Sequence, residues 1–113
     1  MNSNELAHEI GNLLSLKKAV DITLINIAEK SSFADFFVNA TAGSERQLVA
    51  LANDVEDKVA ELGLETKSYE GRAESGWILV DCNEVIVNLF ISDVRDKYAL
   101  DKLWGDCEKE IVE

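Results

Sequence analysis

Residues 76–90 read Gly76-Trp77-Ile78-Leu79-Val80-Asp81-Cys82-Asn83-Glu84-Val85-Ile86-Val87-Asn88-Leu89-Phe90. Two runs rich in apolar and β-branched residues, Trp77–Asp81 and residues 84–90, flank the pair Cys82 and Asn83. Asn tolerates the left-handed backbone that a two-residue hairpin loop requires. The stretch therefore predicts a β-hairpin with Cys82 and Asn83 as its loop.

In this predicted hairpin, Asp81 would lie opposite Glu84 and Trp77 opposite Asn88. Side chains of a strand alternate between two faces. One face would then be entirely apolar and would face the core: Ile78, Val80, Val85, Val87 and Leu89. The other face would be mixed, and we expect a functional surface there: Trp77, Leu79, Asp81, Glu84, Ile86, Asn88 and Phe90.

The composition predicts one soluble globular domain spanning residues 1–113, because the chain has 47% hydrophobic residues, no Pro, and neither a linker nor a repeat. No apolar run approaches the roughly 18 residues of a membrane span. Residues 1–10 resemble neither a secretory signal nor a transit peptide, so we expect a cytoplasmic protein. Its two cysteines, Cys82 and Cys107, would stay unpaired in that compartment.

The charge is strongly acidic, with 22 acidic residues against 11 basic ones and a net charge of −11. Such a field repels phosphate, so direct sequence-specific nucleic-acid binding is disfavoured. A basic protein partner suits this charge better. The alternative is that the acidic residues only confer solubility.

Local patterns predict an α/β domain with a mixed β-sheet of about five strands flanked by helices. Helical spacing and capping residues, including Ser44 and Gly63, predict helices over residues 4–18, 45–62 and 98–106, with a short turn of helix after Ser92. Besides the hairpin, apolar runs predict strands at 20–27, 33–41 and 64–69. Residues 70–75 would form a polar loop, and residues 107–113 a frayed acidic tail.

No set of residues points to catalysis. A Gly-Ser pair ending at Ser44 precedes a helix, as in nucleotidyltransferases, but the following strand lacks the paired carboxylates that metal-dependent chemistry needs. The sole His, His8, is far from Cys82 in the sequence, and Asp81 with Glu84 would be a solvated, repelling pair. We expect no enzyme, no cofactor and no metal site, and a solvated His8.

Large apolar residues beside charged ones are the remaining signal. Trp77 lies near Asp81 and Asn88, whose side chains prefer water, and a second cluster follows within a few residues: Tyr98, Leu100, Lys102, Leu103 and Trp104. Trp and Tyr bordered by charges are typical of protein interfaces. The alternative is that helices of the same domain cover both tryptophans.

Several blocks resemble the ribosomal silencing factor family, also called RsfS or Iojap-like. They run in order from Lys18-Ala19-Val20-Asp21-Ile22 through Ser32-Phe33-Ala34-Asp35-Phe36-Phe37-Val38, Ala40-Thr41-Ala42-Gly43-Ser44-Glu45-Arg46-Gln47 and Gly76-Trp77-Ile78-Leu79-Val80-Asp81 to Tyr98-Ala99-Leu100-Asp101-Lys102-Leu103-Trp104-Gly105-Asp106. The chain has Asn88 where the family usually has a His, and Cys82 and Asn83 where it more often has Tyr-Gly.

The resemblance implies a non-catalytic protein with a nucleotidyltransferase-like fold that lacks catalytic carboxylates. It implies binding to ribosomal protein fourteen of the large ribosomal subunit, a steric block to joining of the small subunit, and repression of translation under nutrient limitation. The partner-binding residues would be Trp77, Tyr98, Leu100, Lys102, Leu103, Trp104 and Asp106. Two alternatives stay open: a metal-dependent nucleotidyltransferase-like enzyme, and a homodimer that pairs its aromatic faces.

Overall fold

Helices and strands alternate irregularly along the chain. The computed structural model describes residues 1–98, 105 and 107–112. In chain order the elements are α1 (Ser3–Leu16), β1 (Val20–Asn26), β2 (Phe36–Ala42), α2 (Glu45–Glu61), β3 (Ser68–Arg72), a 3₁₀ turn (Ala73–Ser75), β4 (Trp77–Asp81), β5 (Val85–Ile91), α3 (Ser92–Tyr98) and β6 (Glu108–Val112).

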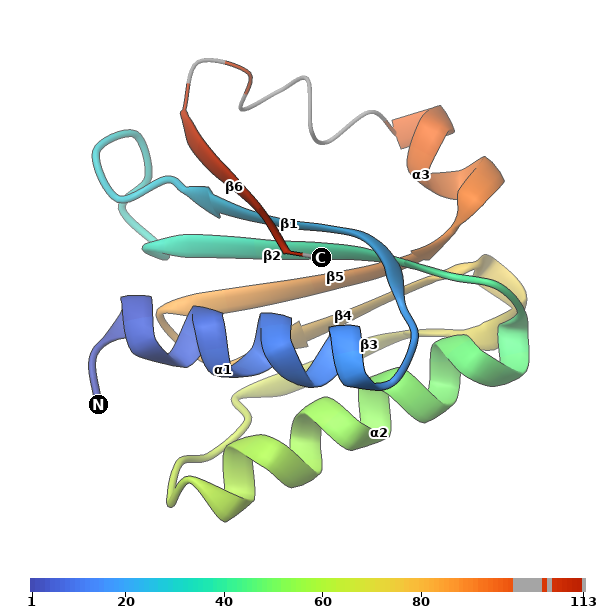
Figure 1. Cartoon of the computed structure of the whole chain (residues 1–113), viewed down its shortest axis with the longest axis horizontal. Helices are drawn as coiled ribbons and strands as arrows, with labels where there is room; N and C mark the ends of the chain where they lie inside the picture. The colour runs from blue at the N-terminus through green and yellow to red at the C-terminus, as the bar shows by residue number, and fades with distance from the viewer. Residues whose placement is uncertain (99–104, 106, 113) are drawn as a thin grey trace.

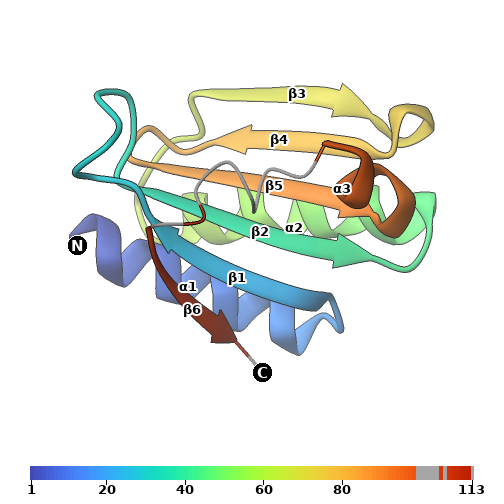
Figure 2. The same ribbon diagram turned by 90° about the horizontal axis from the view of Figure 1, so that it is seen from above.

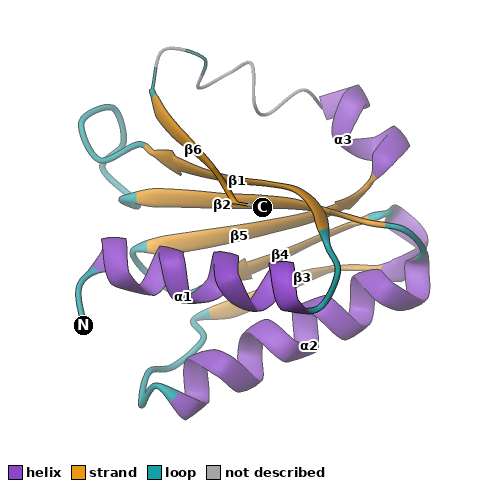
Figure 3. Cartoon of the chain, viewed as in Figure 1, coloured by secondary structure: helices purple, strands orange, loops and turns teal. Residues whose placement is uncertain are grey.

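The strands form one mixed sheet in the order β3-β4-β5-β2-β1-β6. Strands β2 and β5 pair in parallel at its centre, and the other neighbours pair antiparallel. Helices α1 and α2 lie side by side on one face, which we call the helix face (Figures 1 and 3). The opposite face, which we call the distal face, points away from both helices (Figure 2).

Local capping fixes where the two long helices begin. Asn2 accepts a hydrogen bond from the Glu5 backbone N–H at 2.8 Å, and the Glu5 carboxylate accepts one in return from the Asn2 N–H. At α2 the Ser44 hydroxyl accepts from the Gln47 N–H at 3.1 Å, as its sequence predicts. Gly63, at φ +80°, ends α2 with the predicted left-handed residue.

The main core lies between these helices and the helix face. It includes Leu14 of α1, Val55 of α2 and the predicted apolar side of the hairpin, of which Ile78, Val80 and Val87 are fully buried. Burying side chains of this size contributes about 1.5–3 kcal/mol each. The predicted sidedness of the hairpin is therefore confirmed.

The predicted hairpin loop was wrong by one position. The Cys82 N–H donates to the Val85 carbonyl at 2.9 Å, so Asn83 and Glu84 form the loop, and Asn83 takes the left-handed backbone at φ +73°. The pairing is shifted by two residues from the predicted register, and Trp77 lies opposite Phe90 instead of Asn88. Because the shift is even, every side chain keeps its predicted face.

The C-terminal residues form strand β6, a sixth strand, and not the frayed tail that the sequence predicts. β6 pairs antiparallel with the edge of β1 from Ile22↔Val112 to Asn26↔Glu108. The backbone groups of β1 on that side would otherwise lack a partner strand, which explains why a segment with four exposed residues is ordered. The described sheet thus has six strands, not five.

Two further boundaries differ. The strand predicted at 64–69 runs instead over Ser68–Arg72, so the whole of the predicted loop at 70–75 is strand β3 or 3₁₀ turn. The sequence did not predict β3 correctly because β3 is an edge strand whose residues are mostly solvated and carry no apolar alternation.

Within the described part of the chain, no helix is both long and apolar enough to span a membrane.

Candidate interaction surface

Trp77 lies on the distal face at the start of β4, as the sequence predicts. Its indole is partly exposed and stacks on the Phe90 ring, with ring centroids 5.4 Å apart and planes at 30°. Phe90 itself is only 1% exposed and forms the base of this stack. Offset stacking of this kind stabilises an aromatic pair by about 0.5–1.5 kcal/mol beyond its buried area. The indole therefore stands on a rigid support.

A shallow pocket of about 270 Å³ lies beside the indole. Its walls come from the two outermost strands on this side of the sheet and from the turn between them: Glu70, Gly71, Ser75, Trp77 and Leu79. Glu70 is exposed and is the charged residue of this lining. The pocket thus combines an aromatic wall with a solvated carboxylate, which suits a side chain that is apolar along its length and basic at its tip.

Backbone geometry at two glycines holds this pocket in shape. Gly71 has φ +99°, and a Cβ at this position would collide with the backbone carbonyl of Trp77. Gly76 has φ +71°, and its Cβ would lie 2.7 Å from side-chain atoms of Ile91 and Val94. The Ser75 hydroxyl lies 2.7 Å from the Arg72 carbonyl and 3.0 Å from that of Trp77. These contacts restrict the backbone conformation of the turn that leads into β4.

Behind the indole lie two buried amides that the sequence did not lead us to expect. The Trp77 Nε1–H donates to Asn88 Oδ1 at 3.2 Å, and Asn88 Nδ2 donates to Asn39 Oδ1 at 3.1 Å. Asn88 is 1% exposed and Asn39 is 0% exposed. The expectation that Asn88 prefers water is wrong, because these two hydrogen bonds replace its hydration.

On the same distal face, Arg95 of α3 reaches across to strands β1 and β2. Its guanidinium donates to the Asp21 carbonyl at 2.5 Å, to Thr41 Oγ1 at 3.0 Å and to Thr23 Oγ1 at 3.4 Å. Asp21 has φ +51° at an irregularity in the β1–β2 pairing, which turns its carbonyl toward the arginine. Arg95 therefore fixes α3 to the sheet.

Of the seven residues that the sequence assigns to partner binding, the structure describes the side chain of Trp77 alone. Tyr98 is the last residue of α3, and its side chain lies outside the described part. Five others also lie outside the described residues: Leu100, Lys102, Leu103, Trp104 and Asp106. Most of the predicted helix at 98–106 lies there too, so its assignment stays a prediction.

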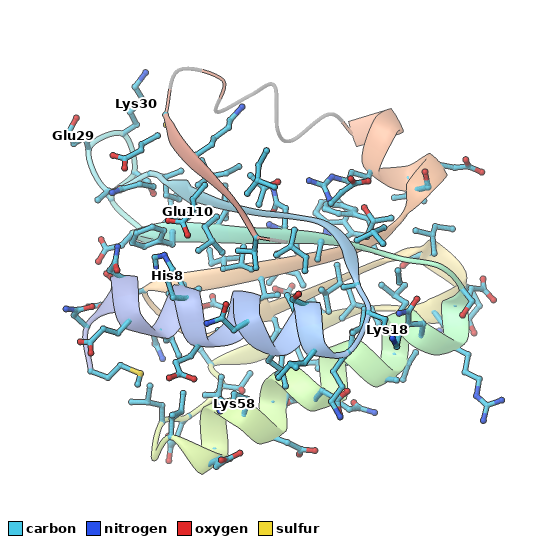
Figure 4. The ribbon with its side chains drawn as sticks, in the orientation of Figure 1. His8, Lys18, Glu29, Lys30, Lys58 and Glu110 are labelled. Carbon is cyan, nitrogen blue, oxygen red and sulfur yellow. The ribbon has the colours of Figure 1, made fainter. Side chains whose placement is uncertain are left out.

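His8 lies at the surface, as its sequence context predicts, with 36% of its side chain exposed, but it also has a partner that the sequence did not predict. On the helix side of the sheet, His8 of α1 and Glu110 of β6 point toward one another (Figure 4), and His8 Nε2 lies 3.0 Å from both Glu110 carboxylate oxygens. A hydrogen bond to the Asn4 carbonyl, together with the Glu110 carboxylate, raises the pKa of His8 above 6.5. The sequence did not predict the pairing of His8 with Glu110, because residues 107–113 were expected to form a frayed tail and not strand β6.

Both described cysteines are free thiols, as predicted. Burial and the nearby carboxylates of Asp81 and Glu56 raise the pKa of Cys82 to about 12, so the thiol stays protonated at neutral pH. Among the residues that the structure describes, no three His, Cys, Asp or Glu side chains gather closely enough to hold a metal ion.

The surface residues that the sequence did not predict share one property: their position depends on the pairing of strands that are far apart in the sequence or whose bounds the sequence did not predict. Asn39 lies beside Asn88 only because β2 and β5 pair in parallel, and Glu70 lies beside Leu79 only because β3 pairs with β4. No local pattern marks either contact. The polar residue in the middle of the otherwise apolar run 36–38 and 40 was the one available signal for Asn39.

The fold and this surface define a class: a six-stranded mixed α/β protein that presents an aromatic surface on the sheet face opposite its two long helices. Comparisons with known proteins agree on the family. The family model described as "Ribosomal silencing factor during starvation" matches residues 1–113. The chain belongs to the ribosomal silencing factor family.

Individual relatives support this assignment. The chain is 37% identical over 106 residues to "Ribosomal silencing factor RsfS" of Halalkalibacterium halodurans, covering 94% of this chain and 91% of that protein. It is 28% identical to the Mus musculus protein named "Mitochondrial assembly of ribosomal large subunit protein 1", covering 82% of this chain and 42% of that protein. A crystal structure of a Chromobacterium violaceum protein superposes with a TM-score of 0.89 at 33% identity, over 93% of this chain and 88% of that one.

Proposed function

We propose that this protein binds the large ribosomal subunit through ribosomal protein fourteen and so prevents the small subunit from joining. Repression of translation under nutrient limitation, in the cytoplasm, would follow from that block. The observation that carries the proposal is the partly exposed Trp77, held on a sheet face beside an open pocket in a chain of the silencing factor family.

The proposed contact is aromatic at its centre and acidic at its rim. Trp77 would be the apolar anchor, since Trp is enriched among the few residues that dominate interface energies. Glu70 at the pocket edge and the net charge of −11 suit a basic partner protein, because complementary fields speed encounter. We place the remaining predicted contacts, among them Tyr98, Lys102, Trp104 and Asp106, on the same partner.

The proposed mechanism is exclusion by volume and needs no catalysis. A protein of 12.5 kDa that buries roughly 800 Å² of its surface on one ribosomal protein occupies the space that an incoming subunit needs. Its efficacy then depends on affinity and concentration alone. The proposal includes that the fold is nucleotidyltransferase-like and lacks the catalytic carboxylates of those enzymes.

Co-sedimentation with purified large subunits tests the proposed surface. Wild-type protein should sediment with the large subunit, and Trp77→Ala should weaken this binding by at least tenfold, as expected for a central aromatic anchor. Tyr69→Ala is the matched control, because Tyr69 is 36% exposed on β3 but points to the helix face. Equal binding by Trp77→Ala and wild type, or an equal loss in Tyr69→Ala, would refute this assignment.

One specific observation favours a second candidate, self-association. The partly exposed Trp77 indole and its pocket could meet the same aromatic face of a second copy in a dimer. Light scattering over a concentration series distinguishes it, since a dimer through this surface would be dissociated by Trp77→Ala. A titration with Mg²⁺ and nucleoside triphosphate tests the enzyme alternative, which predicts saturable, metal-dependent binding.

A further inference from the structure

We propose that Asn39 and Asn88 are positioning residues for the interaction surface: together they form a buried amide relay that sets the orientation of the Trp77 indole. The inference rests on the proposed role of Trp77 in partner binding and extends it to two residues that lie beneath the surface. Neither asparagine would touch the partner, because both are buried.

The relay has only one self-consistent direction. The indole Nε1–H can only donate, so the Asn88 group 3.2 Å away must be its amide oxygen. The Asn88 NH₂ group then faces Asn39, so the Asn39 group at 3.1 Å must also be an oxygen. Each amide orientation is therefore dictated by the donor that precedes it, Trp77 for Asn88 and Asn88 for Asn39. The hydrogen bonds thus run from Trp77 on β4 to Asn88 on β5 and then to Asn39 on β2, at the centre of the sheet.

The relay and the aromatic stack fix different motions of the indole. Stacking on Phe90 at 5.4 Å restricts the ring plane, but a stacked ring can still slide or flip within that plane. The hydrogen bond to Asn88 selects the flip that points Nε1 toward Asn88, so the opposite edge of the indole, which carries only carbon atoms, points away from Asn88. A partner would meet one preorganised indole and not several rotamers.

Burial argues that this polar pair has a specific role. Asn39 and Asn88 are directly paired between β2 and β5, and their neighbours on the same face include the buried apolar side chains of Phe37, Ile86 and Phe90. Moving an amide out of water is unfavourable unless its hydrogen bonds are replaced. Two apolar side chains would pack here without that requirement, but they could not direct the indole.

Three substitutions of Asn88 distinguish the effect of its hydrogen bonds from the effect of its side-chain packing. Asn88→Leu has a similar size and removes both the acceptor and the donor. Asn88→Asp keeps an acceptor for the indole but cannot donate to Asn39 when ionised. Asn88→His can do both, since a neutral imidazole has one acceptor and one donor nitrogen.

The indole itself reports the result without any partner. In ¹H–¹⁵N spectra, the Trp77 Nε1–H resonance, assigned with a Trp77→Phe variant, should move upfield and exchange faster with water in Asn88→Leu. Binding to large subunits should weaken by roughly five- to tenfold in the same variant. Asn88→His should stay close to wild type in both measurements, whereas Asn88→Asp, which keeps the acceptor for the indole, should leave the resonance closer to wild type than Asn88→Leu does. An unmoved resonance in Asn88→Leu would overturn the relay.

A double-mutant comparison separates positioning from general destabilisation. If Asn88 acts only through the indole, Trp77→Ala with Asn88→Leu should bind no more weakly than Trp77→Ala alone. Additive losses would overturn the proposed positioning role. Ile86→Val, which shortens a 7% exposed side chain on the same face of β5, controls for packing and should leave the resonance and binding unchanged. If Trp77→Ala binds large subunits as well as wild type does, the proposed binding surface is refuted. The Trp77 Nε1–H resonance in Asn88→Leu tests the relay separately, because it needs no partner.

Discussion

Replacing Arg95 by Met should destabilise the whole domain, although Arg95 lies in a short helix at one end of the sheet. Met keeps most of the aliphatic stem and removes the three hydrogen bonds to Asp21, Thr41 and Thr23. These contacts join α3 to β1 and β2, which are adjacent strands far from α3 in sequence. Their loss should therefore affect global unfolding and not only the end of the chain.

The size of the effect follows from burial. A hydrogen bond to a charged group contributes about 1.5–3 kcal/mol when buried. Arg95 is partly exposed and Asp21 is exposed, so water replaces much of what is lost. We expect the free energy of unfolding to fall by about 2 kcal/mol, which lowers the Tm of a chain of this size by roughly 8 °C.

Urea unfolding followed by far-UV circular dichroism measures this difference. Arg95→Lys should recover less than half of the loss, because an ammonium group cannot form the same fork of hydrogen bonds. Arg46→Met, an exposed position on α2, is the matched control and should change stability by less than about 0.5 kcal/mol. An unfolding midpoint for Arg95→Met that equals that of the control would refute the proposed clamp.

Three further predictions concern other contacts. The folded-state pKa of His8 is raised above 6.5, so its pairing with Glu110 stabilises the fold fully below pH 6.5 and is lost as the pH rises through the raised value. Because both side chains are more than a third exposed, wild type should exceed His8→Gln by at most about 1 kcal/mol at low pH and by nothing at high pH; a constant difference would contradict this. Cys82, whose pKa burial raises to about 12, should react with thiol reagents far more slowly in the folded protein than in urea, measured in a Cys107→Ser background; equal rates would contradict the buried placement. Gly71→Ala should lower the free energy of unfolding by more than about 2 kcal/mol, because the residue has φ +99° and its Cβ would meet the Trp77 carbonyl; an unchanged urea midpoint would argue against this strand geometry.

Local signals in the sequence were sufficient for the features that depend on neighbouring residues. Ser44 and Gly63 predicted the ends of α2, and the alternation in residues 76–90 predicted which hairpin side chains face the core. The loop was misplaced because the sequence shows that Asn83 can take a left-handed backbone but not whether it is the first or the second loop residue. The faces survived that error because the register moved by two residues.

Features that depend on distant partners could not be predicted in this way. β6 carries three charged residues and has four of its five residues exposed, so only its pairing with β1 reveals a strand. Asn88 reads as a solvated residue until Asn39 is placed beside it by the parallel pairing of β2 and β5. The polar part of the candidate surface was therefore missed, while the position of Trp77 on that face was predicted from alternation alone.

A subunit-joining assay is the sharpest test of the proposed steric block to subunit joining. Purified small and large subunits are mixed in the presence of increasing amounts of this protein and separated on a sucrose gradient. We expect the joined-subunit peak to fall as the protein appears with the large-subunit peak, and we expect Trp77→Ala to restore joining while Tyr69→Ala does not. Undiminished joining with the protein absent from the large-subunit peak would contradict it.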